Sequence, residues 1–180
     1  MDFPKPRPPT VPLSGRSLIT PSQKGPLGLT SIPRKPSRCT QPREQPLTWI
    51  YYKGNDGDLI EEIRNVVDDL ALPTDRELVL GLVSEKNELA ASGDLADSDD
   101  IKPVSFDPEV WELRYEFNGL LYRLYFAEPY THPHHLVALK FHVKTVDEAE
   151  QEIKDAQSAE MAAACIRFNA GEKNNWGSAA

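Results

Sequence analysis

The chain has 180 residues, of which 39% are hydrophobic, and this is enough for one domain with a modest core. The net charge of −8 hides an asymmetry: residues 1–46 hold eight bases and two acids (+6), and residues 47–180 hold 12 bases and 26 acids (−14). No window approaches the ~18 apolar residues of a membrane span, no segment resembles a signal peptide, and two cysteines give no disulfide framework. We therefore expect a cytoplasmic protein that binds no membrane.

Residues 1–46 hold 11 of the 16 prolines. Because proline fixes φ and lacks an amide donor, this composition predicts an extended or disordered basic arm. The stretch 4–12 suits a polyproline II helix, which aromatic grooves bind. The arm either stays solvated or becomes ordered on a partner such as nucleic acid or another protein.

Residues 48–53 are rich in aromatic and β-branched side chains and predict a strand, and the turn residues 54–57 follow. Apolar residues spaced by three and four then predict an amphipathic helix over residues 59–70, with Asp56 or Asp58 as its cap.

Pro73 ends this helix, and the Thr-Asp-Arg-Glu sequence of residues 74–77 is typical of a capping box. It predicts a second helix through about residue 91, antiparallel to the first. We expect three leucines of this helix to face the core: Leu78, Leu82 and Leu89. The acidic stretch 94–100 is predicted to be a loop.

Residues 110–117 alternate between apolar and polar, an Asn-Gly pair is a strong hairpin signal, and residues 120–126 alternate back. A third strand is predicted over residues 136–144 and a last helix over residues 147–167. The expected order is β-α-α-β-β-β-α, an α+β fold with a small antiparallel sheet.

A two-residue turn in this hairpin sets a register that buries three pairs: Trp111/Phe126, Leu113/Leu124 and Tyr115/Tyr122. On the other face Arg114 lies opposite Arg123, and such a pair of like charges costs roughly a few tenths of a kcal/mol. Two interpretations are open. Either Glu112 and Glu116 neutralise the arginines, or the two guanidinium groups bind a phosphate.

Alternation along the third strand is expected to turn one set of side chains to the core: Val137, Leu139, Phe141 and Val143. The same alternation places Lys140, His142 and Lys144 on the face of Arg114 and Arg123. This gathers five cationic or titratable groups on one face of an acidic domain.

Metal-free RNA cleavage needs a base for the 2′-hydroxyl, cations for the phosphate and an acid for the leaving 5′-oxygen. We predict that His142 is the acid or base, because its reference pKa is near neutrality, and that Arg114, Arg123 and Lys144 stabilise the phosphate. Tyr52 either stacks on an RNA base or packs at the sheet edge.

A loop before the third strand contains three histidines: His132, His134 and His135. Zinc sites need further ligands, and no fourth ligand or cysteine spacing accompanies them. We therefore predict an exposed loop, no metal site and no cofactor.

Four blocks, in this order, resemble the phage-derived HigB-like toxins of the RelE superfamily: Trp-Glu-Leu-Arg at 111–114, Leu-Tyr-Arg-Leu-Tyr-Phe at 121–126, Leu-Lys-Phe-His-Val-Lys-Thr at 139–145 and Glu-Ile-Lys-Asp-Ala at 152–156. The family pattern runs W-E-L-R, Y-R-x-x-Y-F, H-G-F-x-K-K-T-x-x-x-P and E-I-x-x-A. The resemblance covers residues 47–169 and implies a RelE-like fold. The family's histidine, glycine, first lysine and proline are replaced here by Leu139, Lys140, Val143 and Ala149.

The resemblance implies a ribosome-dependent endoribonuclease that cuts translated mRNA without a metal and is neutralised by a helix-turn-helix antitoxin. Arg114, Arg123, Lys144 and Thr145 match motif positions of the family, whereas His142 stands at a position that is usually apolar. We expect Lys140 and Thr145, with Tyr52, to bind RNA.

The predicted organisation is a Pro-rich arm (1–46), a RelE/HigB-like domain (47–169) and a flexible tail (170–180). The predicted function is that of the toxin of a type II toxin–antitoxin pair, an mRNA interferase in the bacterial cytoplasm. The alternative is a catalytically inactive interaction module, for example a phage structural or accessory protein that its arm anchors in the virion.

Overall fold

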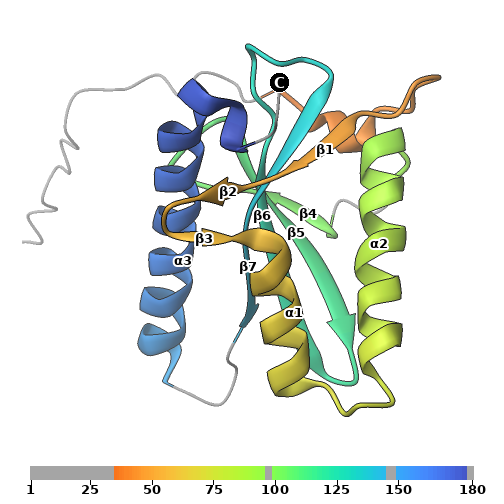
Figure 1. The fold of residues 1–180 in the computed structure, drawn as a ribbon, viewed down its shortest axis with the longest axis vertical. Coiled ribbons are helices and arrows are strands. Elements are labelled where there is room, and N and C mark those ends of the chain that lie inside the picture. The colour runs from red at the N-terminus through yellow and green to blue at the C-terminus, as the bar shows by residue number, and fades with distance from the viewer. Residues whose placement is uncertain (1–34, 96–98, 145–148, 178–180) are drawn as a thin grey trace, which may run out of the picture. The chain divides into compact units, whose positions relative to one another are not determined.

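A computed structural model describes residues 35–95, 99–144 and 149–177, which form an α+β fold around one five-stranded sheet (Figure 1). The helices are α1 (Leu59–Leu70), α2 (Arg76–Ser92) and α3 (Glu150–Gly171), with 3₁₀ segments at Arg38–Thr40 and Glu172–Gly177. The strands are β1 (Thr48–Tyr51), β2 (Lys53–Gly54), β3 (Gly57–Asp58), β4 (Ile101–Pro103), β5 (Val110–Phe117), β6 (Leu120–Ala127) and β7 (His135–Lys144).

The sheet has the order β1-β7-β6-β5-β4, and β2 pairs with β3 in a separate two-stranded ribbon. The prediction of an antiparallel sheet is wrong at one edge, because β1 runs parallel to β7. A parallel pair needs a long crossover between its strands, and here α1, α2 and the β5–β6 hairpin lie between them in sequence. The long elements follow the predicted order, whereas the short strands β2, β3 and β4 were not predicted.

The β5–β6 hairpin has the predicted register. Asn118 and Gly119 have φ angles of 49° and 79°, the positive values that a tight hairpin turn requires. Three pairs therefore lie opposite one another on a buried face, which we call the aromatic face: Trp111/Phe126, Leu113/Leu124 and Tyr115/Tyr122. The opposite side of the sheet, which carries Arg114 and Arg123, is called the charged face.

A bulge in β7 changes which side chains face the core. Tyr125 pairs with Lys140, but the next residue, Phe126, pairs with Ala138, so Leu139 is the extra residue. Phe141 lies on the aromatic face as predicted. Val137 lies on the other face, opposite Ala127. The extra residue turns the side chains that precede it in β7 to the opposite side of the sheet from the one that strict alternation predicts. Both residues are nevertheless fully buried, since helices cover both faces.

The first helix spans the predicted residues, and its cap is Asp58, whose side chain accepts a hydrogen bond from the backbone N of Ile60 at 2.9 Å. The second helix begins after Asp75, which makes no side-chain capping bond.

The predicted inward face of α2 is wrong for Leu78 and Leu89, whereas Leu82 packs against the core. Leu78 and Leu89 are 59% and 41% exposed and Leu82 is half-buried, whereas the residues that face the sheet are Val79, Val83 and Ala90. The helix carries two apolar stripes at helical spacing, and the smaller β-branched and alanine side chains permit the closer approach to the sheet.

The helices cover the two faces of the sheet separately. On the aromatic face, the Tyr115 hydroxyl donates a 2.7 Å hydrogen bond to Asn87 of α2. On the charged face, Gln157 of α3 donates a 3.0 Å hydrogen bond to Glu112. The site residues of β5, β6 and β7 therefore lie between the sheet and α3, which Figure 1 shows at the left of the sheet, with α2 at the right.

Both ends of the described chain pack on the fold. Cys39 is fully buried, and both carboxylate oxygens of Glu128 accept hydrogen bonds from the backbone N of Arg38 at 3.0 Å. At the other end, the Trp176 ring is fully buried and stacks on Phe168 with centroids 5.8 Å apart. The packed region thus begins before residue 47 and continues beyond residue 170. Most of the predicted arm, residues 1–34, lies outside the described residues.

Among the helices of the described residues, none has the length and apolar character required to cross a membrane.

Candidate functional site

Three of the predicted site residues form a row across the charged face. Arg114 of β5 pairs with Arg123 of β6, which in turn pairs with His142 of β7. Lys140 and Lys144 lie on the same face, because they pair with Tyr125 and Leu121 of β6. The predicted placement of all five groups is confirmed, since the bulge in β7 lies before Lys140 and leaves the rest of the strand in register.

A buried carboxylate lies between the two arginines. Oε1 of Glu112 is 2.6 Å from Nε of Arg114 and 3.1 Å from Nε of Arg123. Glu112 is 3% exposed and Arg123 6%, whereas the Arg114 side chain is 35% exposed. Burial lowers the pKa of Arg123, and the charge of Glu112 acts against this shift. One carboxylate thus serves two guanidinium groups, and the trio keeps one net positive charge.

The interpretation that a glutamate neutralises the two arginines is therefore correct for Glu112. Glu116 is exposed and forms no ion pair with either arginine, but its charge acts on the pKa of Arg123 in the same direction as that of Glu112. The two carboxylates differ because Glu112 is buried beneath α3, whose Gln157 bonds to it, whereas Glu116 lies near the hairpin turn and is exposed.

His142 packs flat against Tyr125, with ring centroids 5.4 Å apart and planes inclined by 17°. Its Nδ1 lies 3.2 Å from the carbonyl oxygen of Val143, and its Nε2 lies 3.3 Å from the Tyr125 hydroxyl. Because the carbonyl only accepts, Nδ1 carries the proton and Nε2 accepts from the tyrosine. Burial lowers the pKa of His142, which favours the neutral imidazole needed for a general base.

Lys140 is held by two carboxylates from different helices. Its Nζ lies 3.0 Å from Glu62 of α1 and 3.4 Å from Glu160 of α3. The same Glu62 accepts a 2.8 Å hydrogen bond from the backbone N of Phe141. These contacts give Lys140 a structural role at the edge of β7.

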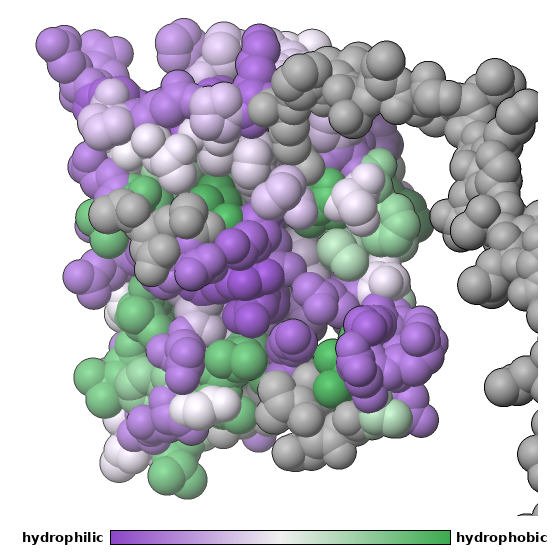
Figure 2. Space-filling model, turned by 180° about the vertical axis from the view of Figure 1, so that it is seen from behind, coloured by the Kyte–Doolittle hydropathy of each residue, from purple (hydrophilic) through white to green (hydrophobic). Residues whose placement is uncertain are grey.

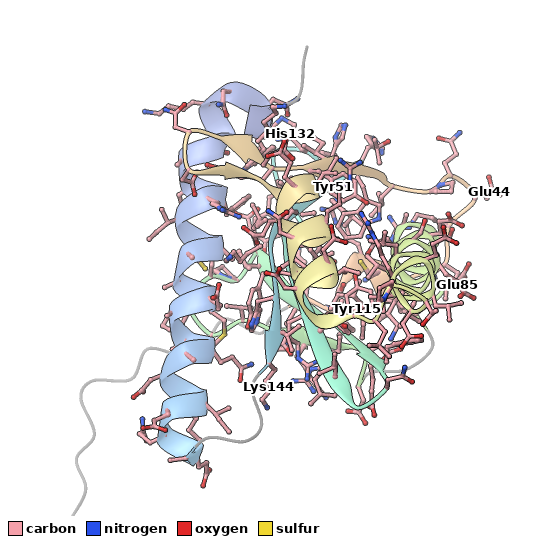
Figure 3. The ribbon with its side chains drawn as sticks, turned by 60° about the horizontal axis from the view of Figure 1, so that its bottom comes forward. Glu44, Tyr51, Glu85, Tyr115, His132 and Lys144 are labelled. Atoms are coloured by element: carbon pink, nitrogen blue, oxygen red, sulfur yellow. The ribbon has the colours of Figure 1, made fainter. Side chains whose placement is uncertain are left out.

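Lys144 lies at the end of β7 that is far from His132 (Figure 3). With His142 it lines an open hollow of about 200 Å³ between β7 and α3, which we call the α3 hollow. Gln157 and Glu160 of α3 add polar groups to the lining, beside apolar side chains of both elements. Thr145, the other predicted residue at this end, lies outside the described residues.

Tyr52 does not join the row. Its side chain is 5% exposed, its hydroxyl donates a 2.5 Å hydrogen bond to Asp56, and the guanidinium of Arg167 covers its ring at 5.0 Å. A ring covered in this way offers no face to an RNA base. The prediction of RNA stacking by Tyr52 is therefore wrong, and the packing alternative is correct.

A second hollow adjoins the other end of the row. It has a volume of about 360 Å³, and Arg114 and Arg123 line it together with residues of α2, β5 and β6. We call it the β5 hollow. Lys86 of α2 also lines it and donates hydrogen bonds of 2.8 Å to Asp100 and to the carbonyl oxygen of Arg114.

Residues that sequence reasoning missed in this region include Tyr125, Gln157, Lys86 and Asp100. Tyr125 lies at the same register position as Lys140, so the hairpin register was a signal that could have placed it on the charged face. The other three reach the site from α2, α3 and a loop, and strand alternation carries no information about them.

Figure 2 shows the molecule from the side opposite to Figure 1. Hydrophilic side chains gather across the middle of this side, and hydrophobic ones lie below them toward α2. Within the described residues, no group of three or more histidine, cysteine, aspartate or glutamate side chains is arranged to hold a metal ion. The ring of His132 instead lies edge-on to Trp176, with centroids 5.2 Å apart.

Comparison of the chain with protein-family models, with curated proteins and with solved structures finds no significant match in any of the three.

Proposed function

We propose that this protein is the toxin of a type II toxin–antitoxin pair, an endoribonuclease that cleaves mRNA on the ribosome without a metal. The observation that carries the proposal is the row Arg114–Arg123–His142, which joins two guanidinium groups to a histidine on three adjacent strands. The resemblance of four sequence blocks to HigB-like toxins points to the same residues. A helix-turn-helix antitoxin is the partner that this function requires.

The chemistry assigns one task to each group. The phosphate of the substrate lies against Arg114, whose guanidinium is exposed enough to reach it, while the buried Arg123 adds positive charge from below. The neutral His142 takes the proton of the 2′-hydroxyl, and the 2′-oxygen attacks phosphorus. The bond between phosphorus and the 5′-oxygen then breaks, and the ammonium of Lys144, at the same hollow as His142, protonates the leaving oxygen.

The two hydrogen bonds of His142 fit this assignment. The carbonyl of Val143 fixes the proton on Nδ1 and so leaves the lone pair on Nε2. Tyr125 occupies that lone pair at a long distance of 3.3 Å, a contact that a 2′-hydroxyl replaces when RNA binds.

Induced expression in a bacterium tests the proposal. The wild-type chain is expected to arrest growth and to leave cut transcripts, and His142→Gln is expected to do neither while folding normally. Arg64→Ala, an exposed change on α1, is the matched control and should arrest growth like the wild type. Unaffected growth and intact transcripts with the folded wild-type protein contradict the nuclease.

A second candidate function is a catalytically inactive interaction module on the same fold. It is favoured by the pairing of Lys140 with Glu62 and Glu160 and of both arginines with Glu112, because these contacts partly neutralise the row. This function predicts co-purification with a protein partner or a phage particle, and no cut transcripts in the same expression experiment.

A further inference from the structure

The phosphate chemistry proposed above uses only Arg114 and Arg123 of the β5 hollow and gives its other side chains no role. It forms because β4 pairs with β5 only as far as Leu113. The backbone N of Arg114 still bonds to the carbonyl oxygen of Asp100 at 2.9 Å, and beyond this point the edge of β5 lies open beside α2. Tyr115 and Lys86 line the hollow there.

The charges around the β5 hollow are balanced. Three basic side chains face three acidic ones: Lys86, Arg114 and Arg123 against Asp99, Asp100 and Glu116. A phosphate prefers an excess of positive charge, so the part of the hollow away from the arginines fits a neutral polar group better.

Two leucines form apolar walls of the same hollow, Leu82 from α2 and Leu121 from β6. Its volume of about 360 Å³ lies at the lower end of the range for small-molecule sites, ~300–1,000 Å³. Apolar side chains beside hydrogen-bonding ones suit a nucleobase, because its faces are apolar and its edges are polar.

We propose that the β5 hollow holds the base of the nucleotide next to the cleaved phosphate and prefers bases that carry an exocyclic amino group. This inference rests on the proposed function, since Arg114 and Arg123 belong both to the row and to the wall of the hollow. The exposed carboxylate of Glu116 accepts a hydrogen bond from the amino group of adenine, cytosine or guanine. Uracil has no amino group and offers only its N3–H, which is flanked by two carbonyl oxygens that the carboxylate repels.

Titration with the four nucleoside 3′-monophosphates tests the inference, with the leucine methyl groups observed by NMR. Leu82→Ile and Leu121→Ile variants assign the two signals. The adenosine, cytidine and guanosine nucleotides are expected to shift both signals and to bind at least about five-fold more tightly than the uridine nucleotide, the ratio expected for one discriminating hydrogen bond.

Glu116→Gln removes the negative charge and gives the side chain an amide donor, so it should reduce this ratio to below about two-fold. Glu61→Gln, an exposed change on α1, is the matched control and should preserve the ratio. No binding, equal affinity for all four nucleotides, or a ratio that Glu116→Gln leaves intact overturns the inference.

The inference and the proposed function fail separately. If the protein cleaves RNA but the nucleotides shift other signals, the β5 hollow is not the base site and the proposed nuclease function is supported. If the nucleotides bind in the hollow as described but no RNA is cut, the hollow is a nucleotide site and the proposed nuclease function is contradicted.

Discussion

The two faces of the central sheet are buried in different ways. The aromatic face holds Leu113, Tyr122 and Leu124 at no exposure, and burial of such side chains favours folding by roughly 1.5–3 kcal/mol each. The charged face buries Glu112 and Arg123 almost as deeply, although taking charges out of water costs free energy that an ion pair rarely exceeds. We therefore expect the aromatic face to contribute most of the stability, and we propose that the charges of the other face are retained for phosphate binding.

Truncation on the aromatic face is expected to have the largest effect. Leu124→Ala leaves a cavity in a fully buried position and should lower the free energy of unfolding by about 3 kcal/mol. Leu78→Ala, on the exposed stripe of α2, should change it by less than about 0.5 kcal/mol. Urea unfolding followed by circular dichroism measures both, and similar losses for the two variants would show that the aromatic face is not the main source of stability.

Removal of the shared carboxylate is expected to be the next largest effect. Glu112→Gln leaves Arg123 buried without its counter-charge and should cost about 2 kcal/mol, less than a full buried pair because Arg114 reaches solvent. Adding Arg123→Met to Glu112→Gln should recover at least half of this loss, because no unpaired charge then remains buried. If the double variant is no more stable than Glu112→Gln alone, the loss does not come from an unpaired charge.

The contact between α3 and the charged face should contribute less. Gln157→Ala removes the hydrogen bond to Glu112 and is expected to lower the free energy of unfolding by about 1 kcal/mol. Gln151→Ala, which removes a bond to Asp155 within α3, is the control and should cost less than about 0.5 kcal/mol. Chemical denaturation measures the unfolding free energy of both variants, and equal losses would mean that Gln157 does not anchor α3 to the sheet.

The smallest expected effect is a pH dependence from His142. Burial lowers its pKa in the folded state, so the unfolded chain binds the proton first as the pH falls below the ordinary value of 6.5. Stability should therefore decline from about pH 6.5 downward, until the folded-state histidine is also protonated. Over this window the unfolding free energy of wild type should fall relative to that of His142→Gln. A difference independent of pH would contradict the buried neutral histidine.

Much of the fold could be predicted from local patterns. The Asn-Gly turn fixed the register of β5 and β6 because only residues that tolerate positive φ form so tight a hairpin, and the register then placed Arg114 opposite Arg123. The first helix has a single apolar stripe, so its face was unambiguous. The row of site residues followed from the same period-two alternation.

The remaining features depend on contacts distant in sequence. The inward face of α2 was ambiguous, because two apolar stripes at helical spacing competed and only tertiary packing selected Val79 and Val83. The parallel pairing of β1 with β7 joins residues from opposite halves of the chain. Composition alone also placed residues 35–46 in the arm, although Glu128 binds the backbone N of Arg38.

Cleavage of mRNA on purified translating ribosomes tests the central claim most directly. Arg114 is the informative position, because its side chain is partly exposed and Arg123 keeps its pairing with Glu112 when Arg114 is removed. We expect the wild-type protein to cut the transcript, Arg114→Ala to slow cleavage by about 100-fold or more, and Arg64→Ala to stay within about two-fold of wild type. No cleavage by the folded wild-type protein, or equal rates for Arg114→Ala and wild type, would contradict it.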